Sequence, residues 1–264
     1  MWYLSVMLIF KNETLNLRTW MEHYLWQGVQ HFFLIDNGST DNPLTILTPY
    51  IERGLVTYVY KPAPYLQVAH YRSTYDECDI RNKTQWLLVC DSDEFVYGIH
   101  GPLIKAVHHV DKRLHKNAIY LHWFSFGNGG VQAHPLDIRT TFVRRQPMDP
   151  IHTKYIVRTA AMTGGSSQLS VHTLVESHTQ RAIPATDRTN ITCADDIIHC
   201  NHYVVQSVEW YQTVKARRGD SASESNNGKC SEQFFEEAER LSTETDTTLR
   251  DLVVLWGNEQ TKRW

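Results

Sequence analysis

Two aspartates separated by one residue follow an apolar segment in Val-Cys-Asp-Ser-Asp-Glu-Phe, which covers residues 89–95. The residues at 86–90 predict a short strand that ends at Asp91. Because the backbone turns where a strand ends, the carboxylates of Asp91 and Asp93 can face one cation. Mg²⁺ and Mn²⁺ take oxygen ligands and are commonly held by one or two carboxylates together with substrate phosphates. The pattern predicts a divalent-metal site for a nucleoside diphosphate, although Asp-x-Asp in a loop is also typical of turns.

Two further polar motifs follow predicted strands. Residues 11–14 read Lys-Asn-Glu-Thr after an apolar segment, and residues 35–42 read Ile-Asp-Asn-Gly-Ser-Thr-Asp-Asn. The first motif favours a helix start in which Asn12 is the cap and Glu13 suits the helix dipole. The second favours an Asx-rich turn. Both motifs can also contribute to a nucleotide pocket, where Asp36 and Asn37 would recognise a base and a ribose.

The elements that must position these motifs alternate along the first half of the chain. We expect strands at 3–10, 31–35, 55–60 and 86–90, and helices between Asn12 and Gly28, at 43–52 and at 67–80. This order predicts an α/β fold with an open, mostly parallel central sheet flanked by helices. Ligands of such sheets bind beyond the carboxyl ends of the strands. The loops that follow the first, second and fourth strands all lie at that edge.

The second half of the chain is less regular. Apolar runs predict strands at 117–124, 154–159, 169–175 and 197–205, and a helix is expected to start near Ser207. Two terminal helices, at 230–241 and 246–257, are expected to cover the sheet, and the polar residues 221–229 to be mobile. We expect a single domain at 1–220, with a donor half at 1–98 and an acceptor half at 99–220, and with residues 221–264 packed on it.

Composition argues against several classes of partner. The chain has 264 residues, a net charge of -3 and no run of like charges, so we expect neither nucleic acid nor an anionic membrane as partner. Its five cysteines show no zinc-like spacing and are typical of free thiols in a reducing compartment. No apolar run approaches the roughly 18 residues of a membrane span. Residues 1–10 lack the basic start of a signal peptide. We therefore expect a cytoplasmic protein without a membrane span.

Taken together, the motifs resemble glycosyltransferases of the GT-A fold, and more narrowly glycosyltransferase family 92 with its bacterial and viral relatives. In the first half the resemblance is carried by Lys-Asn-Glu, Asp-Asn-Gly-Ser-Thr-Asp, Gln67 and Cys-Asp-Ser-Asp-Glu-Phe. Four further segments carry the narrower resemblance to family 92. They are Phe-Gly-Asn-Gly-Gly at 126–130, the run at 154–158, Val171-His172, and the segment 202–219 that starts with His-Tyr and ends with Lys-Ala-Arg-Arg-Gly. The likeness covers most of residues 5–219.

The resemblance implies a Rossmann-like GT-A fold and a metal-dependent, inverting transfer. A hexose or pentose would pass from a nucleotide-sugar donor, expected to be a UDP-sugar, to a glycan hydroxyl, with Mn²⁺ or Mg²⁺ as the metal. Carried over residue by residue, the family implies a set of donor-binding residues: Lys11, Glu13, Asp36, Asn37, Gln67, Asp91 and Ser92. It implies metal ligation by Asp91, Asp93 and His202, with His172 as the second choice for the histidine.

An inverting transfer also needs a carboxylate that accepts the proton of the attacking hydroxyl. The candidates for this catalytic base are Glu176 and Asp196, followed by Asp137.

One position departs from the family pattern. Gln206 stands where the family has a lysine, and a neutral side chain is a poorer phosphate partner. Lys215, Arg217 or Arg218 would then have to contact the diphosphate.

Two other functions stay open. A sugar-nucleotidyltransferase would share the architecture and the use of a nucleotide and a metal. Such enzymes usually carry a Gly-rich, basic loop after the first strand, where this chain has Lys-Asn-Glu-Thr. The second alternative is a non-catalytic carbohydrate-binding relative, against which the presence of both Asp91 and Asp93 argues.

Overall fold

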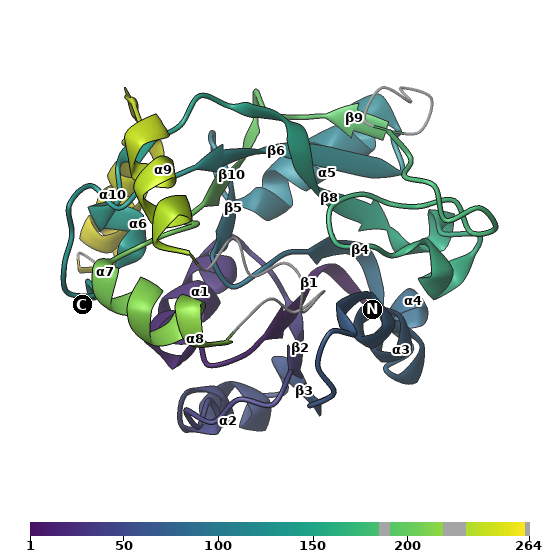
Figure 1. Ribbon diagram of the computed structural model, residues 1–264. Helices are drawn as coiled ribbons and strands as arrows, with labels where there is room; N and C mark the ends of the chain where they lie inside the picture. Colours follow the sequence, from purple (N-terminus) through teal and green to yellow (C-terminus); the bar gives the residue numbers. More distant parts are fainter. Residues whose placement is uncertain (185–190, 219–230, 262–264) are drawn as a thin grey trace.

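The computed structural model describes residues 1–184, 191–218 and 231–261 (Figure 1). Within these residues the predicted α/β architecture is confirmed. One large sheet has the strand order β3-β2-β1-β4-β8-β6-β10-β5, and β9 lies beside β6. The pairs among β3, β2, β1 and β4 are parallel, as are those of β6 with β10 and β9. Two strands, β8 and β5, run antiparallel to their neighbours.

The first half alternates strands and helices as predicted. Its elements are β1 (Trp2–Phe10), α1 (Thr14–Trp26), β2 (His31–Asp36), α2 (Leu44–Glu52), β3 (Val56–Tyr60), α3 (Gln67–Glu77), α4 (Ile80–Lys83) and β4 (Thr84–Val89). Because successive side chains of a strand point to opposite faces, Leu4, Val6 and Leu8 share a core with α1, whereas Met7 and Ile9 share one with α3. The sheet is thus covered on both faces.

The start of α1 differs from the prediction that Asn12 caps the helix. Asn12 has a left-handed backbone conformation with φ of 55°, and its side chain accepts the N–H of Thr40 at 2.7 Å. The helix begins at Thr14, whose N–H and hydroxyl both donate to Asp41 at 2.9 Å. The loops after β1 and β2 are therefore joined to each other at the edge of the sheet.

The second half completes the sheet with β5 (Glu94–Gly98), α5 (Leu103–Leu114), β6 (Ala118–Ser125), α6 (Ile138–Thr141), β7 (Arg144–Arg145), β8 (Asp149–Arg158), β9 (Ile191–Cys193) and β10 (Ile198–His202). Neither β5 nor α5 was predicted. The buried Leu103, Val107 and Val110 recur at the helical spacing that would have indicated α5.

The strand predicted at 169–175 is wrong. After two short 3₁₀ turns, Thr159–Ala161 and Gly165–Gln168, the backbone up to residue 184 is irregular and forms an isolated bridge between Val175 and Ala182. Leu169 and Leu174 are nevertheless buried in the core beside α3, which explains the apolar pattern. The neighbouring β8 is already paired with β4 and β6, so neither of its edges can pair with residues 169–175.

The C-terminal helices gather on the side of the molecule opposite α3 and α4 (Figure 1). Ser207 caps α7 (Val208–Trp210) by accepting the N–H of Trp210 at 3.0 Å, and the helix runs through a π-helical segment (Tyr211–Lys215) into α8 (Ala216–Arg218). α9 (Glu232–Leu241) packs on this helix, β11 (Glu244–Thr245) pairs with β7, and α10 (Thr248–Thr261) packs beside α6.

The predicted mobile segment 221–229 lies outside the described residues. Across the part of the chain that the structure describes, no helix combines the length and the apolar character that a membrane crossing requires.

Candidate active site

A tight turn holds the Asp-Ser-Asp motif at the carboxyl end of β4. The carboxylate of Glu94 accepts the N–H of Asp91 at 2.8 Å, and the N–H of Glu94 donates to the carbonyl of Asp91 at 3.2 Å. From α1, the indole of Trp20 donates to the same carbonyl at 3.3 Å. The turn is therefore fixed from both sides before any ligand is bound.

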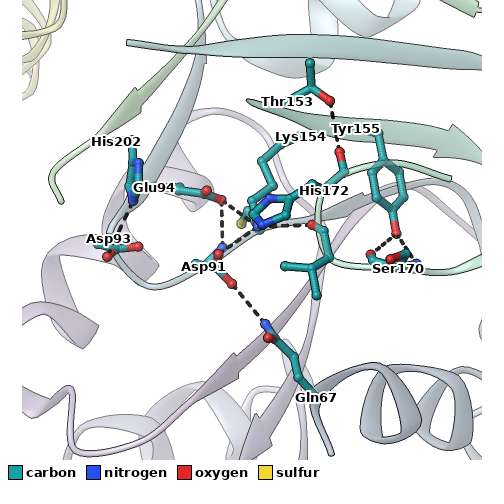
Figure 2. Close-up of polar contacts among 12 residues, drawn as sticks. Gln67, Asp91, Asp93, Glu94, Thr153, Lys154, Tyr155, Ser170, His172 and His202 are labelled. Carbon is teal, nitrogen blue, oxygen red and sulfur yellow. Dashed lines mark hydrogen bonds and ion pairs between the residues drawn. The ribbon is translucent and has the colours of Figure 1, made fainter. Parts of the chain in front are cut away.

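Strand β8 places a lysine beside this turn. Tyr155 pairs with Val89, so the antiparallel register carries Lys154 towards the residues that follow β4. Its Nζ lies 2.7 Å from Asp91 Oδ2 and 3.4 Å from Glu94 Oε2 (Figure 2). Burial by itself lowers the pKa of Lys154, but the two carboxylates outweigh it and raise that pKa well above its ordinary value. Lys154 is thus a buried, charged partner of Asp91.

Strand β10 places His202 beside Asp93, because His202 pairs with Glu94 of β5. His202 Nε2 lies 3.7 Å from Asp93 Oδ2, and Lys215 Nζ lies 3.9 Å from the same oxygen. Burial lowers the pKa of His202, which keeps its imidazole neutral. Burial alone would raise the pKa of Asp93, but His202 and Lys215 lower it to about 2, so Asp93 is ionised.

A cavity of about 620 Å³ opens at this edge of the sheet. One wall comes from the loops after β1, β2 and β4, and a second wall from β6, β8 and the segment that follows β8. A third wall comes from the helical segment that leads into α8 and from α9. Many of the predicted site residues line it: Lys11, Asn37, Gln67, Asp91, Ser92, Asp93, His172, His202, Lys215 and Arg218.

Two predicted donor-binding residues lie behind the cavity wall rather than on it. Glu13 is fully buried, accepts hydrogen bonds from Asn16 and from the indole of Trp210, and forms an ion pair with Arg218. Asp36 accepts the N–H of Ser39 at 2.7 Å and the hydroxyl of Tyr58 at 2.6 Å. Glu13 therefore positions a cavity residue, and Asp36 orders the turn after β2.

The departure at Gln206 also lies off the cavity. Gln206 is buried, and its side-chain oxygen accepts a hydrogen bond from Asn16 at 3.0 Å. Of the three basic residues expected to compensate, Lys215 and Arg218 line the cavity, whereas Arg217 is exposed to solvent and does not.

None of the three carboxylates predicted as catalytic base lines the cavity. Glu176 is exposed and bonds to the hydroxyl of Thr179 within its own turn, and Asp196 is exposed beside β10. Asp137 caps α6 and pairs with Arg139 at 2.6 Å. The structure therefore places these carboxylates away from the site that they were expected to serve.

Of the three predicted metal ligands, Asp93 and His202 face each other, whereas Asp91 points towards other residues (Figure 2). Asp91 faces Lys154 and Gln67, whereas Asp93 faces His202. In the ranges described, no three His, Cys, Asp or Glu side chains form a group that could hold a metal ion. Asp93 and His202 nevertheless present a carboxylate and a neutral imidazole to the cavity, at a separation too long for a mutual hydrogen bond. These two residues fit a divalent cation that also binds substrate phosphates, whereas Asp91 does not fit while Lys154 holds it.

Sequence reasoning missed several residues of the site. Lys154 lies in an apolar run and is fully buried. A lysine is almost never fully buried without a partner, so its position in that run could have indicated a nearby carboxylate. Trp123, Asp149 and His152 also line the cavity, and no local motif marks them.

The sequence profile of glycosyltransferase family 92 matches residues 4–218. No curated protein is significantly similar to the chain. Among solved structures, S. aureus TarS 1-349 has a TM-score of 0.46 and 14% identity, with 80% of this chain and 62% of that chain covered. The same protein in complex with UDP has a TM-score of 0.44 and 13% identity over 80% and 62% of the two chains.

A putative glucose-1-phosphate thymidylyltransferase from Bacillus anthracis, in complex with a sucrose, has a TM-score of 0.40 and 9% identity, with 74% of this chain and 86% of that chain covered. The chain spans 62% of the length of the TarS structures, which is less than two thirds. At these low TM-scores and identities the likenesses do not bear on function.

Proposed function

The chain belongs to glycosyltransferase family 92, and we propose that it transfers a hexose or pentose from a UDP-sugar to a glycan hydroxyl, with inversion and with a divalent cation. The observation that carries this proposal is the cavity in which the loops after β1, β2 and β4 meet Lys215 and Arg218. A nucleoside diphosphate needs cations around its phosphates, and arginine and lysine are the side chains that supply them.

Arg218 is the best placed of these cations for the diphosphate. It lines the cavity, and it is held from behind by the buried carboxylate of Glu13. That carboxylate also accepts the indole N–H of Trp210 at 3.2 Å. We propose that Arg218 and Lys215 contact the donor phosphates, and that Glu13 keeps Arg218 in place.

Asn37 is proposed to recognise the base. Its amide nitrogen donates to the carbonyls of Lys61 at 2.7 Å and Ala63 at 2.9 Å, which fixes the side chain on the cavity wall. The side-chain oxygen of Asn37 would then accept the imide N–H of uracil, a donor that cytosine lacks.

For the metal, we propose that Asp93 and His202 hold Mn²⁺ or Mg²⁺ against the donor phosphates. The bound ion would neutralise charge that develops on the leaving diphosphate. In this arrangement Asp91 stays paired with Lys154 and helps to shape the turn rather than to bind the ion.

A thermal-shift screen of UDP, GDP, dTDP and CMP, each with and without Mn²⁺, tests the donor. A ligand at about 100 times its Kd stabilises the native state by about 2.7 kcal/mol. For a protein of this size that corresponds to a Tm increase of roughly 5–11 °C. We expect this increase for UDP with Mn²⁺ and a smaller one for the other nucleotides. A larger response to another nucleotide would refute the UDP assignment.

Product analysis separates the proposal from its rivals. A glycosyltransferase releases UDP from a UDP-sugar, with water or a glycan as acceptor. A sugar-nucleotidyltransferase instead releases pyrophosphate from a nucleoside triphosphate and a sugar phosphate. A non-catalytic carbohydrate-binding relative releases neither product. Pyrophosphate release, or nucleotide binding without turnover, would contradict the proposed function.

A further inference from the structure

The wall of the cavity formed by β6 and β8 carries a carboxylate and a histidine that are hydrogen-bonded to each other. Asp149 Oδ2 lies 2.6 Å from His152 Nδ1, and Asp149 Oδ1 accepts the backbone N–H groups of Ile151 at 2.7 Å and His152 at 3.1 Å. Both residues line the cavity. The carboxylate therefore orients the imidazole through Nδ1, which leaves Nε2 as the nitrogen that can accept a proton.

Packing against Trp123 fixes the plane of this imidazole. The rings of His152 and Trp123 are stacked with centroids 5.2 Å apart and an interplanar angle of 9°. The same indole makes a T-shaped contact with His172, with centroids 5.1 Å apart, and a tilted contact with His202, with centroids 4.2 Å apart. His152 itself keeps 48% of its side chain exposed, so a substrate hydroxyl can reach it.

The other carboxylates on the cavity wall already interact with basic side chains. In the part of the chain that the structure describes, the wall carries Asp91, Asp93, Asp149 and Glu237. Lys154 holds Asp91, and Asp93 faces His202 and Lys215. Both oxygens of Glu237 accept hydrogen bonds from Arg240, which lower the pKa of Glu237 and make it a weaker base.

We propose that His152, oriented by Asp149, is the general base of the transfer reaction. This inference rests on the proposed function and adds to it the group that activates the acceptor. A carboxylate that holds a histidine in one tautomer and stabilises its protonated form is an established arrangement in other enzymes. Burial raises the pKa of Asp149, but the N–H groups of Ile151 and His152 outweigh it and lower that pKa, so Asp149 is charged.

The step moves one proton and exchanges one bond. The acceptor hydroxyl gives its proton to His152 Nε2 while its oxygen bonds to the anomeric carbon of the donor. The bond from that carbon to the diphosphate oxygen breaks, and its electron pair leaves with UDP. His152 then returns the proton to solvent, and Asp149 stabilises the imidazolium in the interval.

The test is UDP release by the full chain from UDP-galactose, UDP-glucose and UDP-xylose, each with water and with the free sugar as acceptor. His152→Ala should lower kcat by roughly 10²–10⁴-fold, with the KM for the donor and the affinity for UDP unchanged. Added imidazole should restore part of the rate, because it can take the proton in the space that the substitution leaves. His109→Ala, an exposed histidine on α5, is the matched control and should be unaffected.

Asp149 is a positioning residue, so it needs a separate readout. Asp149→Asn should lower kcat without changing the KM for the donor, because an asparagine that donates to Nδ1 leaves the proton on Nε2. The double variant with His152→Ala should be no slower than His152→Ala alone, since residues that act as a unit are not additive.

The outcomes distinguish the two levels of the proposal. If the wild type releases UDP and His152→Ala does so at the same rate, His152 is not the base and the glycosyltransferase assignment stands. If His152→Ala is slow but imidazole gives no rescue and the KM for the donor rises, the role of His152 is structural and the inference falls. If the wild type releases no UDP from any of the three donors, the proposed function fails and this inference fails with it.

Discussion

Replacing Lys154 with methionine should destabilise the protein by about 3 kcal/mol. Methionine keeps most of the apolar volume of the side chain but removes the ammonium group that lies 2.7 Å from Asp91 and 3.4 Å from Glu94. Breaking a buried ion pair costs about 3–5 kcal/mol, because the remaining charge stays without compensation. We expect the lower end of that range, since Asp91 keeps 28% of its side chain exposed and can be partly hydrated.

Asp91 carries most of this effect, because burial raises the pKa of Glu94 to about 8. Burial thus disfavours the ionised form of Glu94, so Glu94 loses less electrostatic stabilisation than Asp91 when the ammonium is removed. For a protein of this size, 3 kcal/mol corresponds to a fall in Tm of roughly 6–12 °C.

Urea unfolding of Lys154→Met, Asp91→Asn and the double variant measures the pair directly. Asp91→Asn leaves Lys154 buried with less compensation, so each single substitution should destabilise, and the double variant should recover part of the loss. The coupling energy should reach roughly 2–3 kcal/mol, within the range for residues in contact. Lys105→Met, an exposed lysine on α5, is the matched control and should change stability by less than about 0.5 kcal/mol. Additive effects of the two substitutions would refute the reasoning.

Three further predictions concern the cavity. Arg218→Met should weaken UDP binding by roughly 10–100-fold, the worth of a hydrogen bond to a charged group, whereas Arg217→Met should not; calorimetry with equal losses would contradict the assignment. Asp93→Asn should abolish the Mn²⁺-dependent part of the thermal stabilisation by UDP, whereas Asp91→Asn should retain it; the reverse result would restore Asp91 as the metal ligand. Asp36→Ala should lower stability by about 1–3 kcal/mol in urea unfolding and leave UDP affinity nearly unchanged; a stable variant with weak UDP binding would place Asp36 in the pocket after all.

Local patterns were sufficient to predict which loops meet at one edge of the sheet. Each of β1, β2 and β4 is a short apolar run followed directly by polar residues. Because parallel strands place their carboxyl ends at one edge, the residues that follow them must meet there. Lys11, Asn37 and Asp91 do line one cavity. The prediction did not require the burial of these residues to be known.

The wall formed by β6 and β8 could not be predicted, because its position depends on long-range strand register. β8 enters antiparallel between β4 and β6, and only that pairing brings Lys154 to Asp91 and Asp149 to Trp123. A buried lysine signals a carboxylate partner, but the sequence does not say which one. His152 carries no signal at all, since a histidine at the exposed end of a strand is common in proteins.

The inward orientation of two carboxylates is a second limit of prediction from sequence. Glu13 and Asp36 follow strands as a ligand-binding residue would, but their oxygens accept hydrogen bonds from the protein itself. Turn formation and ligand binding favour the same residue types in the same places. The two roles separate only when the direction of the side chain is known.

The charges around the cavity favour a metal ion even though its proposed ligands number only two. Three nearby cations already have carboxylate partners, in the pairs Lys154–Asp91, Lys215–Asp93 and Arg218–Glu13. His202 is neutral because burial lowers its pKa. The charges of these three pairs nearly cancel along the wall that a donor diphosphate would contact, and Lys11 adds one positive charge there. A divalent cation at Asp93 and His202 would supply the missing positive charge where the leaving group forms, and buried charges without such compensation are costly.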